Sequence, residues 1–218
     1  MTPAEALARQ PIVVIWRDVE DAHLPNLVEL CVEQRITCVE LTLNTPGAFE
    51  KIRRLVQLAR GRLVVGAGTV LDAAGVQGAH DAGARFIVSP VNVPEVQARA
   101  AQLALPTFPG ALSPQEVWAA MSAGAFMVKV FPAGVFGPSY FKELRGPFKE
   151  ARLLACGGVS AQNVAEYFAA GAEAIALGGS IFRKAWLASG DWDRIGVALQ
   201  EMVTAVERCR SQPPRESL

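Results

Sequence analysis

Eight short apolar runs recur along the chain, and amphipathic segments separate them. Runs of this length, bounded by Gly, Pro and polar residues, are typical of strands rather than helices. The predicted strands are Ile12–Trp16, Ile36–Leu41, Leu63–Val65, Arg85–Val88, Leu105–Phe108, Phe126–Phe131, Arg152–Ala155 and Ala174–Leu177. Strongly apolar strands that alternate with helices predict a parallel sheet whose outer face is covered by those helices.

The segments between the strands are predicted to be helices: Leu24–Arg35, Ala48–Arg60, Val76–Ala82, Glu95–Ala101, Gln115–Ala123, Ser139–Leu144 and Asn163–Ala170. Gly83, Gly124 and Gly171 each follow an Ala-rich helical pattern and precede a strand, as C-terminal helix caps do. Ser113–Pro114 and Ser160 are placed to begin helices.

Eight strand–helix units predict an α/β protein with the TIM (β/α)8 barrel architecture. The competing fold is an open doubly wound sheet, but no GxGxxG follows the first strand and no Walker A sequence occurs. Residues Pro3–Gln10 resemble a short N-terminal helix that closes the bottom of the barrel, and the tail from Ser211 is predicted to be disordered. Residues 1–218 are predicted to form a single domain, since there is no linker.

Charge and composition exclude several classes of protein. The formal net charge is zero, whereas a nucleic-acid-binding surface needs a clustered excess of Lys and Arg. No apolar run is long enough to span a membrane, and the first residues lack the pattern of a signal peptide. We therefore expect a cytoplasmic protein that acts on a small molecule, without nucleic-acid or membrane partners.

The cysteines and histidines do not form a metal-binding pattern. Four cysteines occur without CxxC spacing, and His23 and His80 are the only histidines. A zinc site needs several such ligands at short spacings, so we predict no metal and no cofactor. A Mg²⁺ site built from carboxylates has a weaker sequence signature and stays open at this point.

One of the five lysines stands inside an apolar strand. Lys129 lies in Phe126–Phe131, whereas the other four occupy polar, helix-like segments where an ammonium group meets water: Lys51, Lys142, Lys149 and Lys184. Side chains alternate along a strand, so Met127, Lys129 and Phe131 share the inward face while Phe126, Val128 and Val130 pack against the outer helices. A lysine that loses its proton in a dry site can attack a carbonyl and form a Schiff base.

An acidic residue on the second predicted strand also lies on an inward face. Val39 and Leu41 alternate with Cys38 and Glu40, which places Glu40 on the inward face near the same rim. A carboxylate and an amine in one partly dry cavity shift each other's titration, which general acid–base catalysis exploits. The alternative is a buried Lys–Glu pair with a structural role.

Glycine pairs follow the last two predicted strands. Gly157-Gly158-Val159-Ser160 follows the seventh and Gly178-Gly179-Ser180 the eighth. Backbone N–H groups at helix N-termini bind anions, and barrels often bind phosphate at these two loops. We predict a phosphate site there, with simple turn geometry as the alternative.

Together these motifs resemble the 2-keto-3-deoxy-6-phosphogluconate (KDPG) / 4-hydroxy-2-oxoglutarate (KHG) aldolase family. The matching segments are Val39–Leu43, Val65–Val70, Ile87–Pro90, Phe108–Gly110, Val128–Pro132, Gly157–Val159 and Gly178–Ser180. The resemblance implies a homotrimeric barrel and a metal-free class I aldolase that releases pyruvate. By position, Lys129 matches the Schiff-base lysine, Glu40 the general acid/base, Thr69 and Pro90 the pyruvate pocket, and the glycine turns the phosphate site.

Three positions bear on the substrate. Asn44 stands where the phosphogluconate branch has an arginine, and this is similar to the 2-dehydro-3-deoxy-6-phosphogalactonate branch. Arg17, at the end of the first strand, resembles an arginine that other branches place near the substrate carboxylate. Cys156 replaces a threonine associated with reading the sugar hydroxyl.

The expected reaction is the cleavage of 2-keto-3-deoxy-6-phosphogluconate to pyruvate and D-glyceraldehyde 3-phosphate. Three alternatives stay open on the sequence: the galactonate epimer, cleavage of 4-hydroxy-2-oxoglutarate to pyruvate and glyoxylate, and a catalytically silent barrel that binds phosphate ligands.

Overall fold

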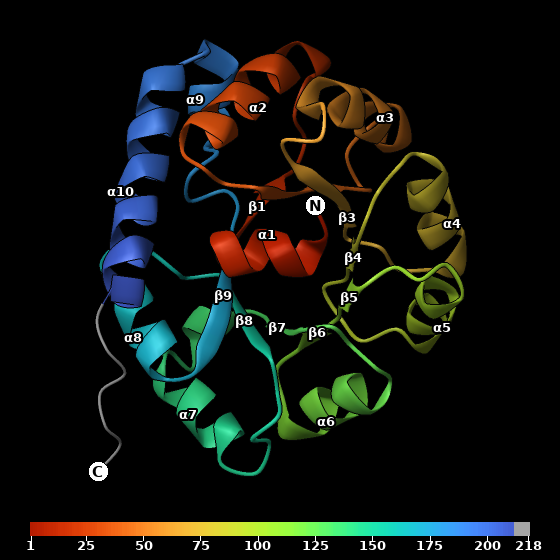
Figure 1. The fold of residues 1–218 in the computed structure, drawn as a ribbon, viewed down its shortest axis with the longest axis vertical. Helices are drawn as coiled ribbons and strands as arrows, with labels where there is room; N and C mark the ends of the chain where they lie inside the picture. The colour runs from red at the N-terminus through yellow and green to blue at the C-terminus, as the bar shows by residue number, and fades with distance from the viewer. Residues whose placement is uncertain (212–218) are drawn as a thin grey trace.

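The strands form one parallel sheet that closes into a barrel (Figure 1). The computed structural model describes residues 1–211. Its strands are β1 (Ile12–Trp16), β2 (Cys38–Thr42), β3 (Val64–Gly68), β4 (Ile87–Val88), β5 (Thr107–Phe108), β6 (Gly110–Ala111), β7 (Val128–Val130), β8 (Leu153–Cys156) and β9 (Ala172–Leu177). They run in the order β5-β4-β3-β2-β1-β9-β8-β7-β6, and every pair is parallel.

The nine strands correspond to the eight predicted ones. Pro109, which has no N–H to donate to a neighbouring strand, separates β5 from β6. The first half pairs with β4 and the second half with β7, so this interrupted strand joins the two edges of the sheet. The predicted TIM barrel is therefore confirmed, with the fifth strand split in two.

Helices surround the barrel in a ring (Figure 1). They are α2 (Leu24–Glu33), α3 (Ala48–Ala59), α4 (Ala73–Asp81), α5 (Pro94–Gln102), α6 (Pro114–Ser122), α7 (Ser139–Arg145), α8 (Val164–Ala169), α9 (Lys184–Ser189) and α10 (Trp192–Ser211), with the short 3₁₀ helices η1 (Asp21–His23) and η2 (Ala133–Val135). The seven predicted helices are present, with ends shifted by up to three residues. The pattern did not assign α9 and α10, which complete the ring after the last strand. Helix α10 includes Ser211, and the rest of the predicted disordered tail lies outside the described residues.

Most of the predicted helix caps are present in the structure. Gly83, Gly124 and Gly171 have φ values of 96°, 82° and 103°, so each predicted C-terminal cap is confirmed in the left-handed conformation that glycine adopts without strain. Ser113 caps α6 in a capping box with Glu116. Ser160 does not cap α8 as predicted, because that helix begins later, after Asn163.

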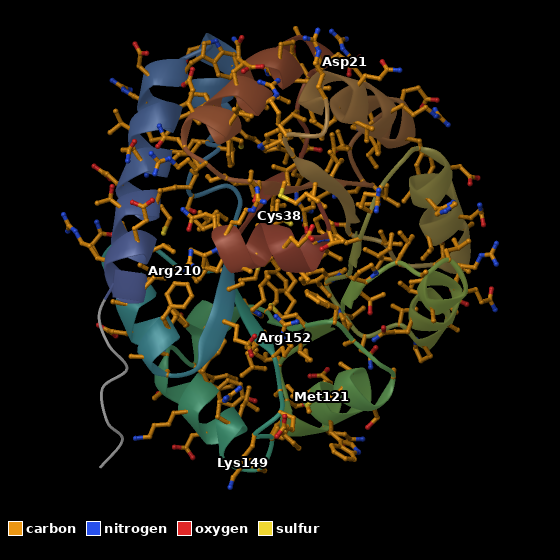
Figure 2. All side chains as sticks on the ribbon, viewed as in Figure 1. Asp21, Cys38, Met121, Lys149, Arg152 and Arg210 are labelled. Atoms are coloured by element: carbon orange, nitrogen blue, oxygen red, sulfur yellow. The ribbon has the colours of Figure 1, made fainter. Side chains whose placement is uncertain are left out.

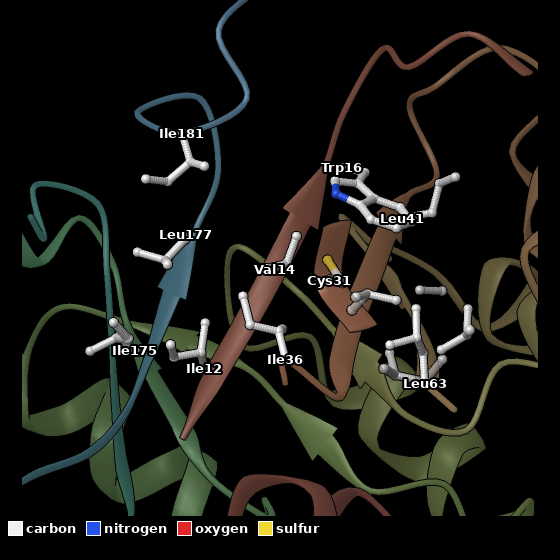
Figure 3. Packing of buried hydrophobic residues seen from close by; sticks show 14 of the residues in the cluster. Ile12, Val14, Trp16, Cys31, Ile36, Leu41, Leu63, Ile175, Leu177 and Ile181 are labelled. Atoms are coloured by element: carbon white, nitrogen blue, oxygen red, sulfur yellow. The ribbon is translucent and has the colours of Figure 1, made fainter. Parts of the chain in front are cut away.

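Alternate strand residues pack outward against the helices. Ile12, Val14 and Trp16 of β1 all belong to this layer, and Figure 3 shows them spaced along the strand, with Ile175 and Leu177 on the neighbouring strand β9. All five are at most 1% exposed. Val39, Leu41, Val128 and Val130 join the same layer, as the alternation predicts.

The other set of alternate residues fills the barrel interior. Val13, Cys38, Met127 and Leu154 form this inner core, together with a cluster of aromatic rings. Phe86 and Phe108 lie 5.4 Å apart between ring centroids, and Phe126 lies 5.3 Å from Phe108. Phe126 therefore packs against the inner core and not against the outer helices as predicted, because it precedes β7 at the end where the chain enters the barrel.

Helix α1 (Pro3–Arg9) closes the N-terminal end of the barrel, as predicted. Its Ala6 and Leu7 pack into the inner core, and Figure 2 shows Cys38 beside the helix. Arg210 of α10 donates hydrogen bonds to the carbonyls of Ala8 and Arg9. These contacts cap the end of α1. Among the described residues, α1 thus covers this end of the barrel with an apolar layer, and the polar inward-facing residues lie toward the carboxyl ends of the strands.

Candidate active site

Inward-facing residues change from apolar to polar along the strands. On β7, Met127 belongs to the inner core and the next inward residue is Lys129. On β2, the inward positions are Cys38, Glu40 and Thr42 in succession. The polar side chains that could carry chemistry therefore lie toward the carboxyl ends of the strands, and apolar residues fill the interior toward the N-terminal end.

Lys129 is buried, with only 6% of its surface exposed. Its Nζ lies 5.2 Å from the centroid of the Phe131 ring, a distance at which a cation is attracted to an aromatic face. Lys129 pairs with Leu154 of β8, so its long side chain reaches the level of Cys156, two residues further along that strand. Within the described residues no carboxylate lies within 4.0 Å of Nζ, so the amine is not tied up in an ion pair.

Glu40 is 1% exposed, and its Oε2 is buried without a hydrogen-bond partner among the described residues. Burial raises the pKa of the Glu40 carboxyl, while the positive charges of Lys129 and Arg17 act in the opposite direction. Gly68 on the neighbouring strand leaves the room that the carboxyl occupies, since a Cβ there would lie 2.4 Å from Oε1. The site thus holds a carboxyl that is able to accept and return a proton, with one oxygen facing no protein partner.

Arg17 and Thr69 come together at the rim. The Nη2 of Arg17, which follows β1, lies 3.4 Å from Oγ1 of Thr69, which follows β3. Thr69 has a φ of 55°, an uncommon value for a residue with a branched side chain. Such strained residues cluster at functional sites. This pair brings a guanidinium and a hydroxyl to the side of the barrel where Glu40 lies.

The largest concentration of predicted site residues surrounds one cavity, here called the rim cavity, of about 400 Å³. It is lined by Ile15, Arg17, Asp18, Phe131, Cys156, Gly157, Gly158, Val159, Ala176, Gly178, Gly179, Ser180, Phe182 and Lys184. Both glycine turns thus lie beside Arg17 and Cys156. Lys129 and Glu40 are not part of the lining. Both lie close enough to Cys156, which does line the cavity, for their charges to act on its thiol.

The glycine turns do not open helices directly, contrary to the expectation. Helix α8 begins only at Val164 and α9 at Lys184. The N–H groups of Ile181 and Phe182 instead bond to the carbonyl of Gly178, which closes a single tight turn. Any anion bound here would contact turn amides rather than the first turn of α8 or α9.

Three more predicted site residues, Thr69, Asn44 and Pro90, are not part of the lining of the rim cavity. Asn44 is exposed on the turn after β2, and Pro90 is half-buried at the end of β4. The carbonyl of Pro90 faces Gly110, where a Cβ would lie 2.0 Å from it. The roles suggested for Asn44 and Pro90 stay predictions.

Sequence reasoning missed three residues near the rim cavity. Lys184, assigned to water, does line the cavity: its Nζ lies 3.6 Å from Oδ2 of Asp18, although its side chain is 90% exposed. The Asp18 N–H donates to the buried hydroxyl of Thr45 at 3.0 Å. No periodic pattern marks these residues, because Asp18 and Thr45 lie on loops and Lys184 on the first turn of α9, and only the closed barrel brings the three together.

The thiol of Cys156 is 4% exposed, and burial raises its pKa. A buried thiol is a weak donor and a small apolar group, so it forms part of the cavity wall. Among residues 1–211, no three His, Cys, Asp or Glu side chains are grouped so as to hold a metal ion, and no helix is long and apolar enough to cross a membrane.

The comparisons with known proteins agree with this geometry. The family model described as "KDPG and KHG aldolase" matches residues 4–198. A probable 2-dehydro-3-deoxy-6-phosphogalactonate aldolase of Rhizobium meliloti is 35% identical over 198 residues, which is 90% of this chain and 93% of the relative. A 2-dehydro-3-deoxy-phosphogluconate aldolase of Pseudomonas aeruginosa is 35% identical over 187 residues, 85% of this chain and 83% of the relative.

Among solved structures, one named "Native KDPGal structure" superposes with a TM-score of 0.88 at 27% identity, covering 94% of this chain and 98% of the other. The family model and both relatives extend over most of the barrel, including the strands that carry Lys129 and Glu40. The protein is thus an enzyme, a carbon–carbon lyase of the class I aldolase type, and the chain belongs to the KDPG and KHG aldolase family.

Proposed function

We propose that Lys129 forms a Schiff base with a 2-keto acid and that Glu40 is the general acid/base of the reaction. Two observations on residues 1–211 carry this proposal. The amine of Lys129 is buried and inward-facing with no carboxylate of this range within 4.0 Å, and the buried carboxyl of Glu40 has an Oε2 without a partner in the same range. Burying both groups costs free energy that a purely structural role would not recover.

The reaction follows from these positions. The unprotonated amine of Lys129 attacks the C2 carbonyl, and protonated Glu40 gives its proton to the departing hydroxyl, so that water leaves and an iminium ion remains. Ionised Glu40 takes the proton of the C4 hydroxyl, the C3–C4 bond breaks, and its electrons form an enamine while an aldehyde leaves. Glu40 then gives the proton to C3, and water hydrolyses the iminium, which returns a proton to Glu40 and releases pyruvate and neutral Lys129. The raised pKa of Glu40 suits both proton transfers.

For the substrate we propose 2-keto-3-deoxy-6-phosphogluconate, cleaved to pyruvate and D-glyceraldehyde 3-phosphate. Arg17 and Thr69 would bind the carboxylate, and the turn amides of Gly157–Val159 and Gly178–Ser180 the distal phosphate. The lining of the rim cavity contains two cationic side chains, Arg17 and Lys184, and one carboxylate, Asp18. This excess of positive charge favours the binding of a dianionic phosphate. Cys156 would lie between the two ends, beside the sugar hydroxyls.

Borohydride trapping tests the Schiff base. The wild-type protein treated with pyruvate and borohydride should gain the mass of one reduced pyruvate adduct, located at Lys129 by peptide mapping. Lys129→Met should gain none and should lose cleavage activity. Lys142→Met, at an exposed helical lysine, is the matched control and should be labelled fully. Wild-type protein without an adduct, or with the adduct on another lysine, would refute the mechanism.

A second substrate has support from particular residues. The R. meliloti relative is named for the phosphogalactonate epimer, and Arg17 at the rim with Asn44 after β2 is the pattern that resembles that branch. Rates of cleavage should therefore be measured for both phosphorylated epimers and for 4-hydroxy-2-oxoglutarate. A rate on the last compound equal to that on the phosphorylated acids would contradict the role given to the glycine turns.

We further propose that the chain functions as one domain and assembles as a homotrimer. Large apolar side chains are exposed after the carboxyl ends of three strands: Leu71, Val91, Val135 and Phe136 are each more than half exposed. Exposed apolar groups of this kind mark protein–protein contacts. Sedimentation equilibrium should give three times the mass of the chain, and a monomer would exclude this assembly.

A further inference from the structure

Thr45 is a polar residue at a buried position, where an apolar side chain of the same shape would also fit the packing. It lies on the turn after β2 and is 2% exposed. Its Oγ1 accepts the N–H of Asp18 at 3.0 Å and lies 3.1 Å from Oγ1 of Thr42, which is fully buried at the end of β2. A buried hydroxyl pair of this kind persists only where both oxygens have partners. Thr45 thus joins the loop after β1 to the strand that carries Glu40.

The residue that Thr45 holds has a strained backbone. Asp18 has a φ of 53°, in the left-handed region that residues with a side chain adopt at a cost. The hydrogen bond from its N–H offsets that cost, so the turn depends on the Thr45 hydroxyl. Without an acceptor at Thr45, the unpaired N–H and the left-handed conformation both favour rearrangement of the turn.

The turn at Asp18 follows one cationic residue, Arg17, and contacts a second, Lys184. Arg17, immediately before Asp18, reaches Thr69 at 3.4 Å. The carboxylate of Asp18 lies 3.6 Å from Nζ of Lys184. Both cations line the rim cavity, Arg17 beside Thr69 and Lys184 six residues after Gly178. The position of one backbone turn therefore sets the places of two positive charges.

We infer that Thr45 is a positioning residue that orients Arg17 and, through Asp18, Lys184 toward the two anionic ends of the substrate. The inference rests on the proposed function, in which the substrate carries a carboxylate and a phosphate. Thr45 is not among the residues that line the rim cavity, so it acts on the substrate through Arg17 and Lys184, and its effect falls on binding. The Schiff-base chemistry at Lys129 is left intact.

Thr45→Val tests this, because valine keeps the shape of threonine and removes the hydroxyl. The variant loses a neutral hydrogen bond and the turn geometry that depends on it, so we expect KM values about five- to ten-fold higher for both pyruvate and the phosphorylated keto acid. The KM for pyruvate is measured by deuterium exchange at its methyl group. We expect kcat to stay within about two-fold and the pH profile to be unchanged. Thr45→Ser keeps the oxygen and should restore both KM values.

Single substitutions at the two cations divide the effect. Arg17→Gln should raise the KM for both compounds, because both carry the carboxylate, whereas Lys184→Gln should raise only the KM for the phosphorylated acid. The increase that Thr45→Val causes for pyruvate then reports on Arg17, and any larger increase for the phosphorylated acid reports on Lys184. If valine prevents folding, Thr45→Cys, whose thiol is a weak acceptor, should raise both KM values by a smaller factor.

Two results would overturn the inference. A lower melting temperature or a lower kcat with unchanged KM values would show that Thr45 is only structural. A wild-type protein that forms no pyruvate adduct would refute the proposed function, and this inference with it. The adduct assay on wild type therefore separates the two failures.

Discussion

Replacing Gly68 with alanine is the sharpest test of the place assigned to Glu40. Gly68 ends β3 directly beside the carboxyl of Glu40, which comes from the neighbouring strand β2. A Cβ at residue 68 would lie 2.4 Å from Oε1, 2.8 Å from Cδ and 3.2 Å from Cγ2 of Thr42. Ordinary contact begins at 3.4 Å, so Oε1 must move by about 1.0 Å, the difference between 3.4 and 2.4 Å.

The size of the expected effect follows from that displacement. Moving a catalytic group by about 1 Å can reduce the rate by about 10²-fold, equal to about 2.7 kcal/mol of activation free energy. Overpacking a buried site costs about 1–3 kcal/mol of folding free energy. In a chain of this size that loss lowers the melting temperature by about 2–12 °C. Gly68→Ala should therefore fold but react slowly.

Gly66→Ala is the matched control on the same strand. Its Cβ would lie 2.4 Å from the ring of Phe86, and its three nearest neighbours are all atoms of that ring, so it overpacks the inner core at Phe86 rather than at the Glu40 carboxyl. Deuterium exchange into pyruvate, followed by NMR, measures proton transfer by Glu40 in both variants, and calorimetry gives their stability. If Gly68→Ala exchanged within about two-fold of Gly66→Ala at similar stability, the position of Glu40 would not limit proton transfer and our reasoning would be wrong.

Three further predictions concern single side chains. Folding raises the pKa of Glu40, so its carboxyl destabilises the fold as the pH rises above the value of the unfolded chain; Glu40→Gln should melt above wild type at pH 7, and the difference should vanish near pH 4. A lower melting temperature at neutral pH would contradict this sign. Cys156→Thr should shift the kcat/KM ratio toward the gluconate epimer while borohydride trapping at Lys129 persists, and an unchanged ratio would remove Cys156 from substrate recognition. Ser113→Ala should cost about 1 kcal/mol in denaturant unfolding, because it removes the α6 cap, with kcat unaffected.

Much of the barrel was readable from the chain because its signals are local. The alternation of apolar runs and amphipathic segments requires only the periods of strand and helix, and it placed all eight strand positions and seven helices. The same alternation put Lys129 and Glu40 on inward faces without any distant contact. It failed at Phe126, which lies before its strand begins, where the two-residue period no longer decides which way a side chain points.

Helix starts and strand breaks that depend on loop contacts were harder to predict from the sequence. Helix α8 begins at Val164 rather than beside Gly157, since the side chain of Asn163 donates to the carbonyl of Gly158 and accepts the Ser160 N–H, which holds a turn between them. Strand five is divided because its two halves bond to different neighbours, a consequence of barrel closure that no single segment encodes.

The sequence by itself determined the barrel class, its covered N-terminal end, and the presence of a lone amine and a carboxyl on interior faces, because each depends on side-chain alternation over a few neighbouring residues. The tertiary structure alone decided which loops share the rim: it joined Asp18 to Thr45 and Lys184, and Arg17 to Thr69, across 27, 166 and 52 residues of chain. Such contacts depend on the register and curvature of a closed sheet, and these are properties of all the strands together.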